Sequence, residues 1–141
     1  MIPKFRFFGK VADGEMRMVL AESIDFENGF VYYSYHDYTV EGDDNVYGDT
    51  IGFEDCVLMQ STGLFDKNGK EIFEGDIVKY KIGCNTYTEE VAYDKNLAGF
   101  GVIYAKADII FTFCELAEDT DLHSIEVIGN IYNNPGLLEG E

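Results

Sequence analysis

Short segments in which apolar and polar residues alternate recur along the chain, with glycine-containing turns between them. The clearest is 77–82, where lysines alternate with apolar residues from Val78 onward. This period of two predicts a strand with one face in a core and the other in solvent. Ile77 breaks the alternation because it is apolar on the lysine side, which predicts a bulge or a strand edge at Asp76.

Further strands are predicted wherever aromatic and β-branched residues, which strands favour, gather in short runs. These runs are 5–8, 16–20, 30–35, 57–60, 72–73, 86–93, 100–104, 109–113 and 124–132. Residues 113–119 are alternatively one turn of helix. Asn134-Pro135 is typical of a helix N-cap followed by proline in the first turn, so a short helical turn is predicted there.

Turn residues separate the predicted strands. Asp13-Gly14 and Asn28-Gly29 are dipeptides typical of tight hairpin turns. Residues 66–69 have Asp first and Gly last, as a type I turn does, and Glu74-Gly75-Asp76 is predicted to reverse the chain again. Residues 41–50 are rich in Gly, Asp and Asn and are predicted to be a loop.

Many short strands with glycine turns and little helix indicate a mainly β protein, either a small β-barrel or a strongly bent antiparallel sheet with short helical turns. A length of 141 residues is typical of one domain. We therefore predict a single domain over 1–141, in which the strands of 1–50 are more variable and 51–141 form the barrel core.

The charge is strongly acidic and unevenly distributed. The formal net charge is −17, with eleven acidic residues and no Lys or Arg in 18–66, and eight acidic residues and no Lys or Arg in 107–141. Such a field repels phosphates, so direct binding of nucleic acid is not expected. Two interpretations remain: a surface that keeps the protein soluble, or a mimic of a polyanion that occupies a DNA-binding protein.

The sequence is typical of a cytoplasmic protein. No apolar run approaches the roughly 20 residues that a membrane helix needs, and the N-terminal residues are too few and too charged for the apolar part of a signal peptide. The three cysteines, Cys56, Cys84 and Cys114, are odd in number and widely spaced, which predicts free thiols in a reducing compartment. Cys114 lies in an apolar aromatic run and is expected to pack as a small hydrophobic residue.

Motifs for catalysis, metals and cofactors are few. The two histidines, His36 and His123, are far apart and have no cysteine nearby, so a zinc site is not expected. A Cys–His pair of Cys56 or Cys114 with His123 stays open. Residues 66–71 lack the full set of oxygen ligands of a calcium loop. No cofactor is predicted, and an enzyme is the less favoured interpretation.

Two groups of residues are candidates for a binding site. Tyrosine suits a protein-binding surface because its ring is apolar while its hydroxyl stays hydrated, and four tyrosines cluster in one segment. They are Tyr32, Tyr33, Tyr35 and Tyr38. The second group consists of turn residues that could line one rim of a barrel, where ligands often bind. They are Thr62, Asp66 and Asp76, and each also has a sufficient architectural explanation.

Four parts of the chain carry a recognisable pattern. They are Pro3–Phe8, 59–72 without Ser61 and Phe65, Gly75–Val78, and Glu126–Pro135 without Asn133 but with Leu137-Leu138. Together they resemble the YopX-like proteins of phages and prophages. The sequence departs from that family at Phe8-Gly9, where Trp-Asp is commoner, at Ser61, where an aromatic is usual, and at Gly136, where Glu is usual.

The resemblance implies a β-barrel-like fold, a phage or prophage origin and a homo-oligomer, but no activity or cofactor. The favoured function is therefore a non-catalytic accessory protein in the host cytoplasm that acts through a protein partner or self-association. One alternative is an acidic DNA mimic that inhibits a host DNA-binding protein. The other is an enzyme handling small molecules, with its site at the barrel rim near Asp66 and Asp76.

Overall fold

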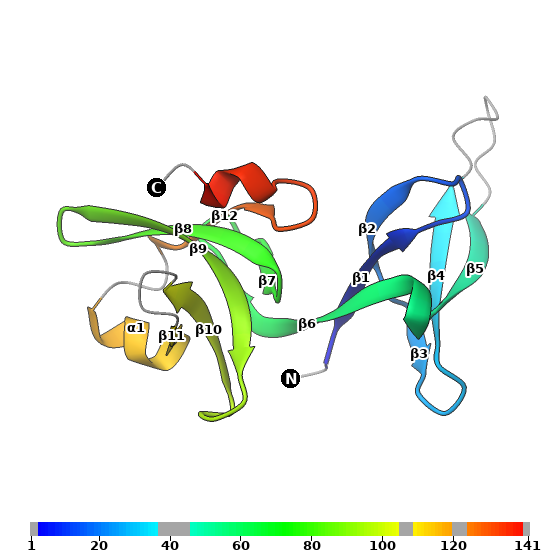
Figure 1. Ribbon diagram of the computed structural model, residues 1–141, viewed down its shortest axis with the longest axis horizontal. Helices are drawn as coiled ribbons and strands as arrows, with labels where there is room; N and C mark the ends of the chain where they lie inside the picture. The colour runs from blue at the N-terminus through cyan, green and yellow to red at the C-terminus, as the bar shows by residue number, and fades with distance from the viewer. Residues whose placement is uncertain (1–2, 37–45, 105–108, 120–123, 140–141) are drawn as a thin grey trace. The chain divides into compact units, whose positions relative to one another are not determined.

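The computed structural model describes residues 3–36, 46–104, 109–119 and 124–139. These residues form twelve strands and a few short helices (Figure 1), which confirms the prediction of a mainly β protein. They cluster in two compact units, Ile2–Gln60 and Ser61–Glu141, called here the N-terminal unit and the C-terminal unit. No helix in the described part of the chain is long and apolar enough to span a bilayer.

The N-terminal unit begins with the hairpin of β1 (Phe5–Lys10) and β2 (Met16–Leu20). The predicted turn lies between them, and Gly14 has a φ of 83°, a left-handed conformation that glycine adopts without steric cost. The first half of β6 (Cys56–Phe65) pairs with the other edge of β1. The order β2-β1-β6 therefore makes one sheet of this unit.

The second sheet of the N-terminal unit has the order β3-β4-β5. Its strands are β3 (Ser23–Asp25), β4 (Phe30–His36) and β5 (Val46–Gly52). The prediction of a loop over 41–50 is wrong from residue 46 onward, because β5 pairs with β4 along its whole length. Residues 46–50 are exposed, so this edge strand tolerates polar residues; 41–45 lie outside the described residues.

The two sheets of the N-terminal unit pack face to face around an apolar core. Phe7, Val19 and Leu58 come from the first sheet, and Val31 and Ile51 come from the second. Strand alternation accounts for this, since Phe7 stands directly opposite both Val19 and Leu58 in the register. The remaining side chains on the other face of β1, β2 and β6 are therefore turned away from this core.

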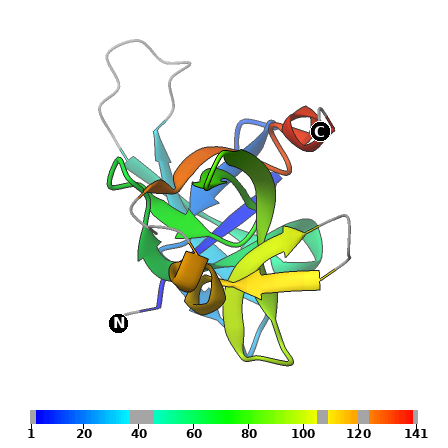
Figure 2. The ribbon, with the colours of Figure 1, turned by 90° about the vertical axis from the view of Figure 1, so that its left-hand side faces the viewer.

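The C-terminal unit is built on a five-stranded antiparallel sheet with the order β11-β10-β9-β8-β12. The strands are β8 (Asp76–Ile82), β9 (Asn85–Asp94), β10 (Gly99–Tyr104), β11 (Ile109–Thr112) and β12 (Glu126–Asn130). The sheet curls into a half-barrel, and α1 (Phe113–Asp119) lies beside β10 and β11 (Figure 2). The prediction of a strongly bent sheet with short helical turns is confirmed.

The predicted alternation in β8 is present, with Val78 and Tyr80 buried and the two lysines exposed. Ile77 is also buried. The position of Ile77 predicts an irregularity at Asp76, but the irregularity lies on the neighbouring strand. There, β12 bulges between Val127 and Gly129, opposite Val78 and Ile77 of β8. One extra residue in β12 accommodates the change of register.

The core of the C-terminal unit lies on the inner side of the curled sheet. Val78, Val91 and Val102 of the sheet pack with Phe113 and Leu116 of α1. Both alternatives for 109–119 are thus partly realised, because β11 ends at Thr112 and the helix begins at the next residue. The helix packs on the core with its two buried apolar residues.

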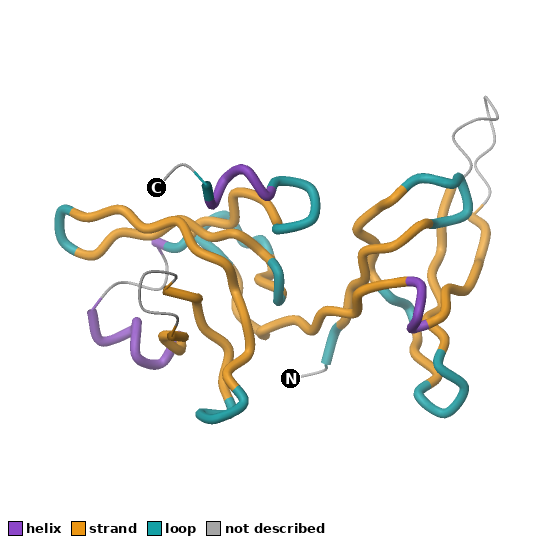
Figure 3. The backbone as a smooth tube through the Cα atoms, in the orientation of Figure 1, coloured by secondary structure: helices purple, strands orange, loops and turns teal. Residues whose placement is uncertain are grey.

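Turn residues tie the C-terminal unit together at the end of β6, which continues as a strand up to Phe65 (Figure 3). The next strand is β7 (Glu71–Phe73), which pairs with the second half of β6. The turn between them has the predicted hydrogen bond from the Gly69 N–H to the Asp66 carbonyl, at 3.0 Å. At the following corner, Gly75 has a φ of 83°, and its carbonyl accepts a hydrogen bond from the N–H of Ile131.

The predicted helical turn after β12 is the short helix η3 (Pro135–Leu138), with proline in its first turn. Asn134 occupies the N-cap position, but its side chain makes no capping hydrogen bond to η3. Its Oδ1 instead accepts a hydrogen bond from the N–H of Asn130 at 3.3 Å. Asn134 therefore ties the helix back to the end of β12.

Candidate interaction surface

The sheet β2-β1-β6 has a second apolar face on the side opposite the core of the N-terminal unit. Antiparallel sheets with one solvated face normally carry polar residues there. Here the alternating positions are mostly apolar, and their register places Met18, Phe8 and Val57 in one row across the three strands. We call this surface the methionine face, and its apolar members are Phe8, Met16, Met18, Leu20, Val57 and Met59.

Half of the methionine face is exposed to solvent. Met16 is 54% exposed, Leu20 63% and Val57 44%, whereas Met59 is buried. Single exposed apolar residues are ordinary, but adjoining ones on three paired strands form a patch, and such patches mark interaction sites. Methionine side chains are also flexible and adapt to the shape of a partner.

A groove of about 970 Å³ adjoins this face at the free edge of β2. Residues 18–24 line it as a continuous run, together with Phe5 and Phe26. Phe26 is 68% exposed and makes an edge-on contact with the ring of Phe5, whose centroid is 6.5 Å away. The groove thus combines apolar walls with a sheet edge.

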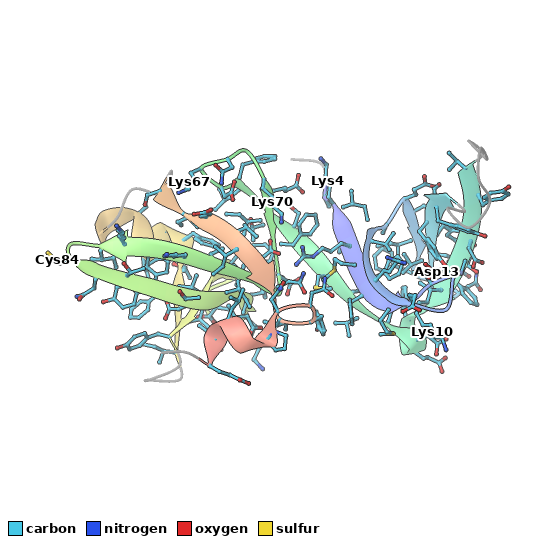
Figure 4. The ribbon with its side chains drawn as sticks, turned by 90° about the horizontal axis from the view of Figure 1, so that it is seen from above. Lys4, Lys10, Asp13, Lys67, Lys70 and Cys84 are labelled. Atoms are coloured by element: carbon cyan, nitrogen blue, oxygen red, sulfur yellow. The ribbon has the colours of Figure 1, made fainter. Side chains whose placement is uncertain are left out.

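Charged residues lie in the groove and beside it in the sequence. Glu22 lines it and accepts a hydrogen bond from the Ser34 hydroxyl. Asp25 and Glu27 lie on either side of Phe26 in the sequence, and Glu27 is exposed. Hydrogen bonds from the Asn28 amide and backbone lower the pKa of Asp25, so it stays ionised. Lys4 also lines the groove at the start of β1 (Figure 4).

The predicted tyrosine surface is divided by strand alternation. Tyr33 is buried: its hydroxyl accepts a hydrogen bond from the Ala12 N–H at 3.1 Å and donates one to Asp49 at 3.3 Å. Burial and the Asp49 charge raise the pKa of Tyr33. Tyr35 is half-buried on the same face of β4, whereas Tyr32 is exposed on the opposite face. Tyr38 lies outside the described residues.

The three predicted rim residues bind backbone groups of the protein itself. The Thr62 hydroxyl donates to the Ile72 carbonyl at 2.7 Å, and the Asp76 carboxylate accepts from the Phe73 N–H at 2.8 Å. Asp66 accepts from Asn68, Lys70 and Val127. Burial acts to raise the pKa of Asp66, but these backbone donors outweigh it and lower the pKa. These contacts are sufficient to account for all three residues architecturally.

One polar pair is buried in the core of the C-terminal unit. The Tyr80 hydroxyl donates a hydrogen bond to the Glu89 carboxylate, and both side chains are buried. Across the described ranges, no three His, Cys, Asp or Glu side chains gather closely enough to hold a metal ion. The pair therefore has the features of a structural hydrogen bond within an apolar core.

The cysteine predictions have mixed outcomes. All three thiols are free. The expectation that Cys114 packs as a hydrophobic residue is wrong, because it lies on the outer side of α1 and is exposed, while Phe113 and Leu116 take the buried positions of the helix. His123, the partner considered for a Cys–His pair, lies outside the described residues.

The methionine face was not identified from the sequence. The signal is present in 16–20, where apolar residues occupy both alternating sets of positions instead of one. A strand with two apolar faces is buried on both sides or exposes one of them. The neighbours that decide between these outcomes come from β1 and β6, and the sequence did not reveal this pairing.

Comparisons with known proteins cover nearly the whole chain. A family model described as YopX protein matches residues 4–139. The chain is similar to the crystal structure of protein EF1440 from Enterococcus faecalis, at 28% identity and a TM-score of 0.60, over 98% of this chain and 99% of that one. It is also similar in fold to the X-ray structure of yopX from Bacillus subtilis, at 21% identity and a TM-score of 0.60, over 96% and 97% of the two chains. No curated protein matches the chain.

Proposed function

The chain belongs to the YopX protein family, and from its surface we propose that it is a non-catalytic accessory protein of a phage or prophage that acts through protein–protein contacts in the host cytoplasm. The observation that carries this proposal is the exposed methionine face on the sheet β2-β1-β6. The hydrophobic effect favours covering such a face, and a partner protein or another copy of the chain would do so.

Covering this face contributes favourably to the energy of a protein contact. Fully burying one large aliphatic or methionine side chain contributes about 1.5–3 kcal/mol. Met16, Leu20 and Val57 are each about half exposed, so covering them together contributes a few kcal/mol before the cost of association. In protein interfaces a few residues often carry most of the binding energy.

The test compares two leucines of similar exposure. Leu20 on the methionine face is 63% exposed, and Leu97 in the β9–β10 turn is 60% exposed. Immobilised wild-type protein should retain a host protein from lysate. Alternatively, wild-type protein in solution should self-associate, as measured by light scattering. Leu20→Lys should weaken this binding at least tenfold, whereas Leu97→Lys should leave it unchanged. Equal binding by wild type and Leu20→Lys, with both variants folded by circular dichroism, would contradict the proposal.

A second candidate function is the acidic mimic of DNA, and the exposed acidic side chains of the N-terminal unit favour it. The exposed acidic residues of this unit include Glu22, Glu27, Asp49, Glu54 and Asp55. Exposed charges are screened by salt, so a partner of a mimic should be released steeply as the salt concentration rises. A partner of the methionine face should instead depend on apolar contacts and be released by Leu20→Lys.

A further inference from the structure

We propose that the groove beside β2 binds an extended segment of a partner protein in which apolar and basic residues alternate, and that this segment adds as a strand to the free edge of β2. This inference rests on the proposed function, because it names the chemistry of the partner that meets the methionine face. Strand addition of this kind draws affinity from backbone hydrogen bonds and specificity from alternate side chains.

The free edge of β2 provides the backbone groups. Among the described residues, β2 is the end strand of its sheet and is hydrogen-bonded to β1 only. Native proteins usually protect such an edge with proline, lysine or inward-pointing charges. Residues 16–20 contain neither proline nor lysine, and their one charged residue, Arg17, is held by Asp13 of the same hairpin at 2.7 Å.

The volume of the groove is compatible with a short extended segment. Its volume of about 970 Å³ is at the upper end of the roughly 300–1,000 Å³ of pockets for small ligands. The strand β2 has five residues, and a matching five-residue segment is about 17 Å long. The residues that line the groove include the whole second half of β2 and the first residues of β3.

Alternation then determines the two faces of the bound segment. One set of its side chains would continue the methionine face beside Met18 and Leu20 and should be apolar. The other set would point to the same side as Val19, where the second sheet packs and where β3 brings Glu22 to the groove. Side chains of this second set should be basic, because Glu22 lines the groove and Asp25 and Glu27 flank the lining residue Phe26 in the sequence.

Charge also favours a basic partner over a second copy of the chain. Two copies each carry a net charge of −17, and their fields oppose association. A basic segment is attracted by the same field, which increases its rate of encounter. Of the groove residues that the structure describes, Lys4 is the one basic and Glu22 the one acidic residue, so the preference for a basic segment comes from the net charge and from Asp25 and Glu27, which flank Phe26 in the sequence.

The probe for the test is a fluorescent hexapeptide of alternating lysine and valine, acetylated and amidated, measured by fluorescence polarisation at about 0.15 M salt. Two matched peptides separate the contribution of charge from that of backbone hydrogen bonds. One replaces lysine by glutamate, and the other keeps lysine but carries N-methyl groups on alternate amides. We expect saturable binding of the first peptide and at least tenfold weaker binding of the other two. Hydrogen exchange of the β2 amides should slow when the first peptide is bound.

Protein variants locate the site. Leu20→Lys should weaken binding of the lysine–valine peptide at least tenfold, and Leu97→Lys should leave it unchanged. Equal affinity for the N-methylated peptide, an equal effect of both leucine variants, or no saturable binding would overturn the inference. Dimerisation of the protein that is abolished by Leu20→Lys would also overturn it, because a second copy would then occupy the edge. In that case the proposed function stands. If wild-type protein binds no partner in lysate and does not self-associate, the proposed function itself is overturned.

Discussion

The carboxylate of Asp66 accepts a hydrogen bond from the backbone N–H of Val127, 61 positions further along the chain, at 2.9 Å. Its other oxygen accepts from the N–H groups of Asn68 and Lys70. A nearby ion pair between Lys67 and Glu126, at 3.1 Å, joins the same two segments. Asp66 thus holds the β6–β7 turn and the start of β12 together.

Asp66→Asn should destabilise the protein by about 1–3 kcal/mol at neutral pH, because an amide offers an N–H group to at least one of the three backbone donors. Urea unfolding measures this change. Asp25→Asn, at the end of β3, is the matched control and should lower the stability less, since the hydrogen bonds from Asn28 join the Asp25 carboxylate to the turn that directly follows it. An equal cost for both variants would contradict the role assigned to Asp66.

The same carboxylate should contribute to the acid sensitivity of the protein. The pKa of Asp66 is lowered in the folded state from its ordinary value of 3.8. Its stabilising contribution is therefore complete above the ordinary pKa and is lost as the pH falls through the lowered folded pKa. The stability curve of wild type should fall between about pH 5 and pH 2, and the difference between wild type and Asp66→Asn should shrink over that range.

Gly101 of β10 should be intolerant of any side chain. A Cβ at this position would lie 2.1 Å from the carbonyl oxygen of Phe111 on β11. Gly101→Ala should therefore push β11 away from β10 and lower the stability by about 1–3 kcal/mol or more. Gly136→Ala is the control, because a Cβ there meets nothing within 4 Å, and it should be neutral or slightly stabilising. Thermal unfolding of the two variants separates these outcomes.

Tyr33→Phe should destabilise the N-terminal unit although the ring is kept. The variant leaves the Ala12 N–H without its acceptor and removes the hydrogen bond to Asp49, at a cost of about 1–3 kcal/mol. Tyr32→Phe, on the exposed face of the same strand, should have a stability close to that of wild type. If the two variants unfold at the same urea concentration, the buried hydroxyl does not stabilise the fold.

The three thiols should differ in reactivity. Cys84 at the tip of the β8–β9 hairpin (Figure 4) and Cys114 on α1 are exposed, whereas burial and the Asp55 charge raise the pKa of the half-buried Cys56. Because the thiolate is the reacting form, iodoacetamide should modify Cys84 and Cys114 first and Cys56 last. Peptide mass spectrometry over a time course measures the order, and modification of Cys56 at the rate of Cys84 would contradict it.

Local features of the fold were predictable from the sequence. The turns at Gly14, Gly29 and Gly69 depend on positive φ values within one or two residues, and the turn dipeptides indicate them directly. The strand β5 was missed because its pattern of Gly, Asp and Thr is typical of loops. Its pairing with β4, residue by residue, is a tertiary interaction that overrides local propensity.

The candidate site was harder to predict because it depends on contacts between distant segments. Met18 and Val57 flank Phe8 on the same face only because β2 and β6 both pair with β1, and the sequence did not reveal the strand order. The four tyrosines were visible as a cluster, but alternation turns Tyr32 and Tyr33 to opposite faces. The period of a strand could have indicated that division; only the packed sheets indicate which face is buried.

The strand β6 belongs to both compact units, since Cys56–Gln60 pair with β1 and the segment from Ser61 pairs with β7. The two halves of this ten-residue strand therefore report on the stability of the two units separately. Native-state exchange of amides before and after Gln60 compares the opening free energies of the two units within one peptide. Equal values on the two sides would identify one cooperative domain, as the length predicts, and a step at Gln60 would identify two folding units joined through a single strand.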